Sequence, residues 1–219
     1  VRGEILKGKK CTVFCSGNVA IYTIEKLYHL GALPITCSDS SGMILDEEGI
    51  DLELLKDLKE NQRARLTEYV KYRKNAKYIP VSDYPKGRNA VWSVPCFAAF
   101  PSATQNELNL EDAKELIKNG CVCVSEGANM PSTNEAVDFF VAQKIAYGPG
   151  KAANAGGVAT SQLEMAQNAS MVSWTFEEVD AKLEQIMRNI FESVSTTAAE
   201  FGQPTNFVLG ANIAGFRRV

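Results

Sequence analysis

Hydrophobic residues along the chain form short apolar runs that alternate with longer segments of helical periodicity. The first run, residues 11–15, predicts a β-strand, and the apolar positions of residues 18–30 recur every three or four residues, as on one face of an α-helix. The alternation then continues to residue 201. Further strands are predicted at residues 34–37, 77–81, 96–100, 121–124 and 145–147, and further helices within residues 51–73, 110–118, 132–141 and 175–201, with another helix opening at residues 155–157.

Alternating strands and helices of these lengths are typical of an α/β fold with a doubly wound, mostly parallel, Rossmann-type sheet flanked by helices. Residues 82–95, which contain Pro and Gly, are predicted to form a loop. The last predicted helix is the longest, and Thr175 with Glu178 three residues later has the form of a capping box at its start. The sequence shows no internal repeat and no linker that would split the chain.

Composition and charge narrow the class of protein. The 219 residues are 45% hydrophobic and 22% charged, which is typical of a globular chain. A net charge of −3 without a basic stripe argues against nucleic-acid binding. No apolar run approaches the roughly 18–20 residues that span a bilayer, and the charged N-terminus has no apolar segment of a signal peptide. Because the first residue is Val1 rather than Met, we expect a piece of a longer chain or the loss of an upstream segment.

Cysteine and histidine usage argues against a metal site and against nucleophilic catalysis. The six cysteines lie at positions 11, 15, 37, 96, 121 and 123, and we predict reduced core thiols, as in a cytosolic-type protein. Two neighbouring cysteines without histidines make a poor zinc site, so no metal is expected. The single histidine, His29, has no acid or nucleophile beside it in sequence, and we predict that it packs at the end of the first helix.

The turn between the first strand and the first helix partly matches the dinucleotide fingerprint G-x-G-x-x-G/A. Gly17 occupies the middle position and Ala20 the last, and Asp39 follows at the distance of the acidic residue that binds a ribose. Cys15 stands where the first glycine belongs. By itself the match indicates a dinucleotide site and an ordinary strand–helix turn equally well. Since residues 11, 13 and 15 alternate as one inward face of a strand, we predict a negative φ at Cys15.

Six segments in chain order together carry a specific resemblance. They are residues 16–20 (SGNVA), 38–42 (SDSSG), 103–107 (ATQNE), 126–131 (EGANMP), 149–158 (PGKAANAGGV) and 210–216 (GANIAGF). On these segments the chain resembles the cofactor-binding domain of the hexameric, NADP-dependent glutamate dehydrogenases. It departs from the family at Cys15, at Phe97, where the family often has Asp, and at Ser102, where it often has Cys.

The resemblance implies a role for each matched position. The expected cofactor-binding residues are Ser16, Gly17, Asn18 and Val19 at the pyrophosphate, Asp39, Ser40, Lys59 and Arg65 at the adenosine end, and Ala103, Thr104, Asn106, Gly127, Asn129 and Asn154 towards the nicotinamide. The expected substrate-contacting residues are Lys151, Val158 and Ser161. The family's catalytic lysine and aspartate belong to a substrate domain that nothing in this chain matches, so no catalytic residue is expected here.

Several of these residues also have a purely structural explanation. Asn18 could cap the first helix, and Asn106 could cap the helix that begins near Leu110. Lys59 and Arg63, four residues apart, could form a solvated helix face. The glycines at 156 and 157 could serve a loop that needs positive φ.

The resemblance further implies the parent reaction, the reversible oxidative deamination of L-glutamate to 2-oxoglutarate and ammonia, with NADP as cofactor and NAD as a second possibility. It places a dinucleotide-binding domain at residues 1–174 and helices that lead towards the substrate domain at residues 175–219. The parent is expected to be a homohexamer of the cytoplasm or an organelle, and this chain alone to be inactive. The alternatives are a domain of another amino-acid dehydrogenase, whose pocket would prefer an apolar residue at Ser161, and a non-catalytic nucleotide-binding or oligomer-interface module.

Overall fold

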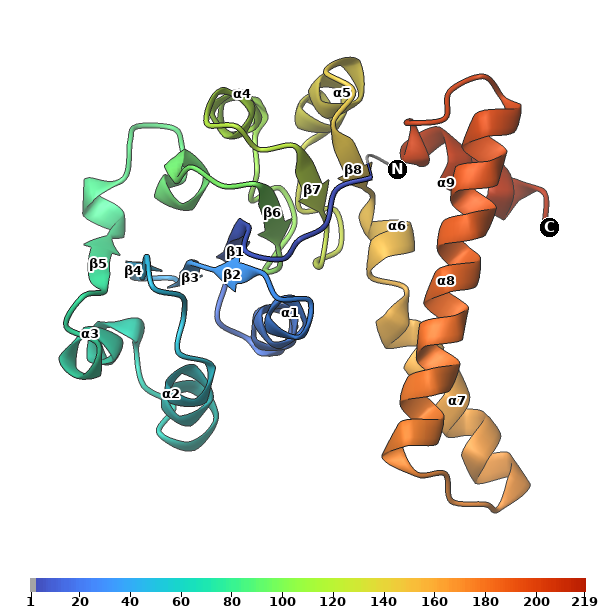
Figure 1. Cartoon of the computed structure of the whole chain (residues 1–219), viewed down its shortest axis with the longest axis horizontal. Helices are drawn as coiled ribbons and strands as arrows, with labels where there is room; N and C mark the ends of the chain where they lie inside the picture. Colours follow the sequence, from blue (N-terminus) through green and yellow to red (C-terminus); the bar gives the residue numbers. More distant parts are fainter. Residues whose placement is uncertain (1–2) are drawn as a thin grey trace. The chain divides into compact units, whose positions relative to one another are not determined.

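A five-stranded sheet forms the centre of the computed structural model, which describes residues 3–219 (Figure 1). In spatial order its strands are β2 (Leu33–Pro34), β1 (Lys10–Phe14), β6 (Ala98–Pro101), β7 (Cys123–Ser125) and β8 (Ala146–Gly148). The pairs β1–β2, β1–β6 and β6–β7 are parallel. Cys11 and Val13 of β1 are fully buried, and so is Thr12 between them, because both faces of the sheet are covered. The predicted fold class is confirmed.

A second sheet of three antiparallel strands continues from the β1 side. It consists of β3 (Thr36–Asp39), β4 (Gly42–Leu45) and β5 (Lys77–Pro80). The amides of Ile35 and Ser38 donate to the carbonyls of Cys11 and Cys15, so β3 runs in the same direction as β1. No strand was predicted at residues 42–45, although Met43 and Ile44 are fully buried. The strand is short and directly follows a tight turn, which hid its apolar run.

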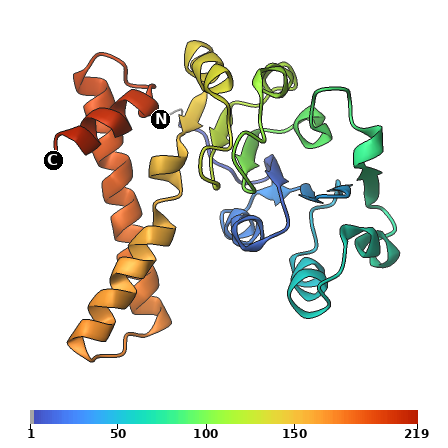
Figure 2. The same cartoon turned by 180° about the vertical axis from the view of Figure 1, so that it is seen from behind.

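Helices cover both faces of the sheets, as a doubly wound fold requires (Figures 1 and 2). Figure 1 shows α1 (Asn18–His29) and α2 (Leu52–Lys56) on one face, and α4 (Leu110–Lys118) and α5 (Asn134–Ala142) on the other. Side chains of the preceding residues fix where α4 and α5 begin: Asn109 and Asp112 form a capping box, and Thr133 caps α5. Helix α1 buries Ile21, Ile24 and Leu27 of its predicted apolar stripe, whereas Val19 and Leu30 at the ends of the stripe are 47% and 50% exposed. His29 is exposed rather than packed.

The segment 51–73 is rich in helix, as predicted, but its helical elements are short. It comprises α2, a π-helical turn (Asp57–Asn61), a 3₁₀ turn (Leu66–Glu68) and α3 (Tyr69–Tyr72). Arg63 adopts a left-handed conformation, with φ of 52°. The chain turns there because the Leu66 amide donates to the Asp39 carboxylate at 3.0 Å. Lys59 and Arg63 therefore do not share a helix face, and that part of the prediction is wrong.

The predicted loop at residues 82–95 contains buried structure. It has two 3₁₀ turns, Val81–Asp83 and Ala90–Ser93, and Trp92 in the second turn is fully buried. The Trp92 ring lies 5.6 Å from the ring of Phe14, and its indole N–H donates to the Glu107 carbonyl at 3.3 Å. This side chain anchors the loop against the start of the segment that leads to α4.

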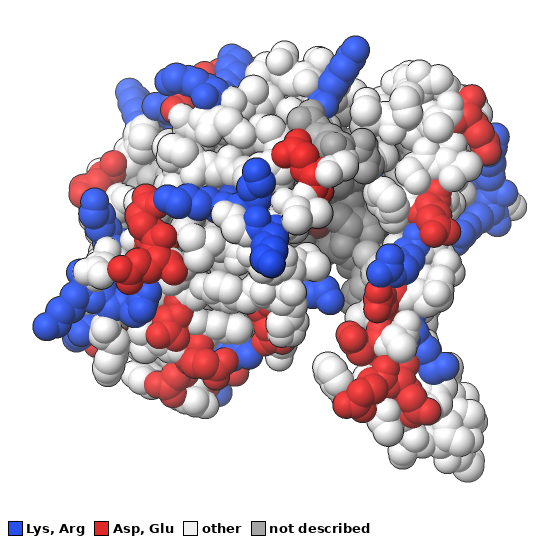
Figure 3. Space-filling model, in the orientation of Figure 1, with Lys and Arg blue, Asp and Glu red and all other residues white. Residues whose placement is uncertain are grey.

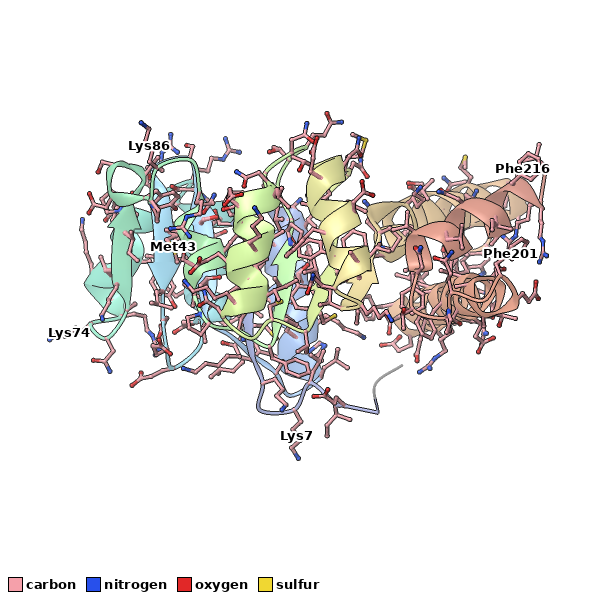
Figure 4. The ribbon with its side chains drawn as sticks, turned by 90° about the horizontal axis from the view of Figure 1, so that it is seen from above. Lys7, Met43, Lys74, Lys86, Phe201 and Phe216 are labelled. Carbon is pink, nitrogen blue, oxygen red and sulfur yellow. The ribbon has the colours of Figure 1, made fainter. Side chains whose placement is uncertain are left out.

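The chain divides into two compact units, residues 1–146 and residues 147–219. The second unit contains α6 (Gly150–Ala153), α7 (Gly156–Ser170), α8 (Phe176–Glu200) and α9 (Phe207–Phe216), and the capping box predicted for Thr175 and Glu178 is present. Helix α9, one of the helices expected within residues 175–219, crosses α8 closely: a Cβ on Gly210 would lie 2.2 Å from the Val194 carbonyl oxygen. Phe201 and Phe216, labelled in Figure 4, remain 50% and 83% exposed.

The distribution of charged side chains and the state of the cysteines agree with the expectations from the sequence. Basic and acidic side chains are interspersed over the face of the first unit that Figure 3 shows. All six cysteines lie within the described residues and are free thiols. Between residues 3 and 219 no helix is long and apolar enough to cross a bilayer.

Candidate functional site

The carboxyl ends of β1, β3, β6 and β7 and the loops that follow them carry most of the predicted site. Helix α1 starts directly behind β1, with Gly17 at the cap position. Among the described residues no side chain caps this helix start, and its first turn contains no acidic residue. Asn18 is the first helical residue, so its predicted capping role is wrong. The exposed first-turn amides and the positive end of the helix dipole suit an anionic group.

Gly17 is not needed by the fold itself. Its φ is −84°, which any residue adopts, and a Cβ at Gly17 would meet only the Cys15 Sγ, at 3.7 Å. Ser16 beside it is buried, and Val19 is 47% exposed. The missing side chain at Gly17 leaves the helix start open to close approach from outside the chain, as a bound pyrophosphate requires.

Cys15 adopts the conformation of the glycine that it replaces. Its φ is 99°, so the predicted negative φ is wrong. The reason is the turn itself: the Cys15 amide donates to the Ser38 Oγ at 2.8 Å, and its carbonyl accepts from the Ser38 amide at 3.1 Å. These two bonds hold the end of β1 to β3. The Cys15 Sγ accepts from the Gly17 amide at 3.3 Å, so the thiol lies over the turn.

The loops after β6 and β7 converge on the start of α1. The amides of Gly127 and Ala128 both donate to the Pro101 carbonyl, at 2.9 and 3.1 Å. A Cβ on Gly127 would lie 2.9 Å from the Ser102 Oγ and 3.0 Å from the Val19 Cγ1. Only glycine fits here without displacing a neighbour, so Gly127 sets how closely the three loops approach.

Ala103, Thr104 and Asn106 lie in the loop after β6, and Asn129 lies in the loop after β7. Thr104, Asn106 and Asn129 are exposed. Asn106 does not cap α4, because Asn109 does so, and that structural alternative is wrong. Instead Asn106 has φ of 54° and its amide donates to the Met130 carbonyl at 3.0 Å, which ties the two loops together.

The Asp39 carboxylate organises the end of β3. One of its oxygens accepts from the Ser41 amide and hydroxyl, at 2.8 and 2.6 Å, and the other accepts from the Leu66 amide at 3.0 Å. Partial burial disfavours the charge, but the hydrogen bonds from Ser41 and Leu66 and the nearby Lys59 hold the pKa of Asp39 below its ordinary value. Both oxygens are therefore engaged by the protein.

The two basic side chains predicted for the adenosine end, Arg65 and Lys59, interact with Ser40 and Asp39 respectively. Arg65 is exposed, and its Nη1 donates to the exposed Ser40 Oγ at 2.7 Å. Lys59 donates to the Ala64 carbonyl at 3.1 Å and acts on Asp39 through its charge. A hydroxyl beside a guanidinium and an ammonium is a donor set that suits a phosphate monoester.

The remaining predicted residues lie in the second unit. Val158 and Ser161 are exposed and three residues apart on α7, hence on neighbouring positions of one face. Lys151 of α6 donates to the Asn212 Oδ1 of α9 at 2.5 Å, and both side chains are exposed. Asn154 ends α6, and its carbonyl accepts from the Gly157 amide at 3.3 Å.

Gly156 and Gly157 do not occupy a loop with positive φ, so that structural explanation is wrong. Both lie in the first turn of α7. A Cβ on Gly156 would touch Leu183 and Met187 of α8 at 3.6 Å, whereas a Cβ on Gly157 would have no neighbour within 4 Å. Both distances for Gly156 are ordinary van der Waals contacts, so packing within the described unit requires a glycine at neither position.

Glu107 is the residue of this site that the sequence analysis missed. Its carboxylate accepts from the Ala103 amide at 3.2 Å and from the Thr104 amide at 2.5 Å. The spacing of Thr104 and Glu107 is that of half a capping box, and this signal was present in the sequence. It was overlooked because the helix that follows begins only at Leu110.

Comparison with known proteins places this geometry in a family. Residues 1–219 match the family described as Glutamate/Leucine/Phenylalanine/Valine dehydrogenase. The NADP-specific glutamate dehydrogenase of Helicobacter pylori is 66% identical over 218 residues, which cover 100% of this chain and 49% of the relative. The glutamate dehydrogenase of Bacteroides thetaiotaomicron is 52% identical, over 100% of this chain and 48% of its own length.

A solved structure gives the same result. The crystal structure of Plasmodium falciparum glutamate dehydrogenase superposes with a TM-score of 0.89 at 47% identity, over 96% of this chain and 44% of that one. This chain thus spans about half the length of the relatives it matches. Because the match extends over every residue of the sequence, the chain belongs to the Glutamate/Leucine/Phenylalanine/Valine dehydrogenase family.

Proposed function

We propose that this chain is the NADP(H)-binding part of a glutamate dehydrogenase, the enzyme that interconverts L-glutamate with NADP⁺ and water, and 2-oxoglutarate with ammonia and NADPH. The observation that carries the proposal is the uncapped start of α1 behind Gly17, a glycine that neither φ nor packing requires. The names of the similar relatives support the choice of reaction and cofactor. Residues 1–174 would hold the cofactor, and residues 175–219 would lead towards the substrate domain.

The first-turn amides of α1, with Ser16, Gly17, Asn18 and Val19, would hold the pyrophosphate. At the adenosine end, Ser40, Arg65 and Lys59 would bind the 2′-phosphate through charge-assisted hydrogen bonds. Asp39 would serve this phosphate rather than a ribose hydroxyl, since both its oxygens already accept from Ser41 and Leu66 and fix the turn that presents Ser40. This arrangement favours NADP(H) over NAD(H).

The loops after β6 and β7 would orient the nicotinamide half, with Ala103, Thr104 and Asn106 in one and Gly127 and Asn129 in the other. When bound, the nicotinamide supplies the hydride acceptor at C4. The protein residues supply position and exclude water. Asn154, at the end of α6, would contact the same half of the cofactor.

Lys151, Val158 and Ser161 would contact the amino-acid substrate. The Ser161 hydroxyl, which is exposed on α7, supports a substrate with a side-chain carboxylate, because a pocket for Leu, Phe or Val would favour an apolar residue at that position. The lysine and aspartate that move protons would come from the part of the enzyme outside this sequence. We further infer a homohexameric parent, and the free thiols support the cytoplasm or another reducing compartment.

A calorimetric titration with NADPH tests the proposal, with Gly17→Ala as the informative variant. The fold tolerates a methyl group at Gly17, so its thermal midpoint should match the parent's, while the methyl group would occupy the space of the pyrophosphate. We expect NADPH affinity to fall at least tenfold in Gly17→Ala. No NADPH binding by the parent chain, or equal binding by both proteins, would contradict the proposal and favour a non-catalytic module.

A further inference from the structure

The Glu107 side chain spans the turn that follows β6. Glu107 spans it with both carboxylate oxygens, one on the Ala103 amide at 3.2 Å and one on the Thr104 amide at 2.5 Å. The backbone carbonyl of Glu107 accepts from the indole N–H of the buried Trp92, which fixes the main chain of Glu107 in place. The conformation of the turn therefore depends on this carboxylate.

Helix formation does not explain Glu107. Helix α4 begins three residues later and has its own complete capping box, in which Asn109 accepts from the amides of Glu111 and Asp112 while the Asp112 side chain accepts from the Asn109 amide. Nor does an ion pair explain it, since within residues 3–219 the partners of its carboxylate are backbone amides. What Glu107 does in the fold is to hold residues 102–104.

The surroundings of Glu107 make its charge costly. Burial raises the pKa of Glu107 to about 7. Hydrogen bonds from the amides of Thr104, Ala103 and Ser102 favour the ionised form and partly offset this rise. The negative charge of the buried Glu126, just after β7, raises the pKa further. Glu107 also borders a cavity of about 440 Å³ together with Tyr84, Lys86 and Arg88 of the loop after β5 and Asp112 of α4. Arg88 is paired with Glu115 at 2.7 Å rather than with Glu107, and the Asp112 carboxylate, which accepts from backbone amides, brings no positive charge to the cavity.

We propose that Glu107 is a positioning residue for the cofactor, whose ionised carboxylate holds the Ala103 and Thr104 amides and thereby keeps the turn after β6 in the shape that meets the dinucleotide. The inference rests on the proposed function, because it assumes that this turn contacts the cofactor. A protonated Glu107 has one accepting oxygen fewer, so one of the two amides loses its partner and the turn loosens. Cofactor affinity should therefore fall as the pH drops through about 7.

Acidification should raise the stability of the fold while it weakens cofactor binding. These opposite pH dependences distinguish a positioning role of Glu107 from a purely structural one. The pKa of Glu107 is raised from 4.5 to about 7 in the fold, so the folded state takes up a proton in this window. Its contribution to stability is complete below pH 4.5 and is lost as the pH rises through about 7. Acidification to pH 6 thus strengthens the fold at this site and weakens the proposed binding.

Nuclear magnetic resonance of the 219-residue chain tests the hold on the turn without any cofactor. The amide proton shifts of Ala103 and Thr104 should titrate with a midpoint near pH 7 in the parent and should not titrate there in Glu107→Gln. Glu111→Gln, which neutralises an exposed carboxylate at the start of α4, is the matched control and should titrate like the parent. Amides that do not respond between pH 5 and 9 in the parent would overturn the inference.

Titration with NADPH at several pH values tests the link to the cofactor. Glu107→Gln resembles the protonated form of Glu107. The Kd of this variant for NADPH should therefore be about ten times that of the parent at pH 8, and the two Kd values should become equal at pH 5.5. The 2′-phosphate of NADPH titrates in the same way with both proteins, so its effect cancels when the Kd values are compared. A ratio that does not change with pH overturns the inference alone, even if the amides titrate. If no NADPH binds at any pH, the proposed function fails as well, so the two failures are distinguishable.

Discussion

Asn106 and Met130 both adopt left-handed backbone conformations, with φ of 54° and 50°, and the Asn106 amide donates to the Met130 carbonyl at 3.0 Å. This bond joins the loop after β6 to the loop after β7. Leu108 extends the connection, since its amide donates to the Pro131 carbonyl at 3.0 Å. The two loops that would orient the nicotinamide are therefore joined by hydrogen bonds, and a substitution that moves one loop should also move the other.

Gly127→Ala should damage this surface. The added methyl group would lie 2.9 Å from the Ser102 Oγ and 3.0 Å from the Val19 Cγ1, so the buried Ser102 hydroxyl and the Val19 side chain must shift to admit it. We expect a loss of about 1–3 kcal/mol in the free energy of unfolding, as for other overpacked sites, together with weaker NADPH binding. Urea denaturation and calorimetry measure the two effects. Gly157→Ala, which meets no atom within 4 Å, is the control and should leave stability unchanged or raise it.

Arg65→Ala should weaken the binding of NADPH but not of NADH. The Arg65 guanidinium is held against Ser40 at 2.7 Å, where a 2′-phosphate would accept from both. Charge-assisted hydrogen bonds contribute about 1.5–3 kcal/mol, so the Kd for NADPH should rise roughly 10- to 100-fold. Arg63→Asn removes the same charge two residues away and tolerates the left-handed backbone, so it should have little effect. Equal losses for both nucleotides would mean that Arg65 supports the fold rather than the phosphate.

Regular elements could be predicted from the sequence where periodicity and caps agree. Helix α4 begins and ends where its pattern predicted, and α8 starts at the capping box of Thr175 and Glu178. Within residues 51–73 helices were predicted correctly, but the shared helix face of Lys59 and Arg63 was wrong, because the chain turns at Arg63 and the Asp39 carboxylate accepts from the Leu66 amide. A contact between residues 27 positions apart leaves no local signal.

The candidate site was predictable in its positions and less so in its bonds. The family resemblance predicted Ser40 and Arg65 as cofactor-binding residues, but only the structure shows that they form a hydrogen bond with each other. Similarly, Lys151 reaches Asn212, 61 residues further along the chain, which no spacing rule indicates. The left-handed backbone at Cys15 also depends on a tertiary partner, the Ser38 hydroxyl.

The 219-residue chain should not catalyse oxidative deamination of glutamate. Under the proposed function the groups that transfer protons would lie outside it, and general acid–base catalysis alone contributes about 10²–10⁴-fold. Without the substrate domain the chain would also not orient the substrate for reaction. An assay of NADPH formation at high protein concentration, with glutamate and NADP⁺, checks this expectation. Turnover at an ordinary rate would show that the chain holds its own catalytic groups.

Asp39→Asn should lower stability at neutral pH, and the loss should shrink in acid. The folded-state pKa of Asp39 is lowered, so its contribution is present above the unfolded pKa and is lost as the pH falls through the folded value. Because the group is partly exposed, we expect about 1 kcal/mol at pH 7 from the weakened bonds to Ser41 and Leu66. Urea midpoints at pH 7 and below pH 4 give the comparison. Asp83→Asn, at an exposed carboxylate, should show no such difference.

Cys15→Gly should stabilise the protein. A non-glycine residue at φ of 99° carries a strain of about 1–3 kcal/mol, whereas glycine adopts this conformation freely. Two losses oppose the gain: glycine adds about 0.5–1 kcal/mol of unfolded-state entropy, and the Sγ contact to the Gly17 amide disappears. We expect a net increase of about 1 kcal/mol in the free energy of unfolding, measured by urea denaturation.

Cys15→Ala separates the strain from the thiol. Alanine loses the Sγ contact to Gly17 but keeps the Cβ that makes positive φ unfavourable, so it should be no more stable than the parent. The difference between the Gly and Ala variants then measures the backbone strain directly, because both lack sulfur. If the Gly variant is as unstable as the Ala variant, the turn does not strain Cys15, and the thiol contact rather than the backbone decides stability at the first fingerprint position.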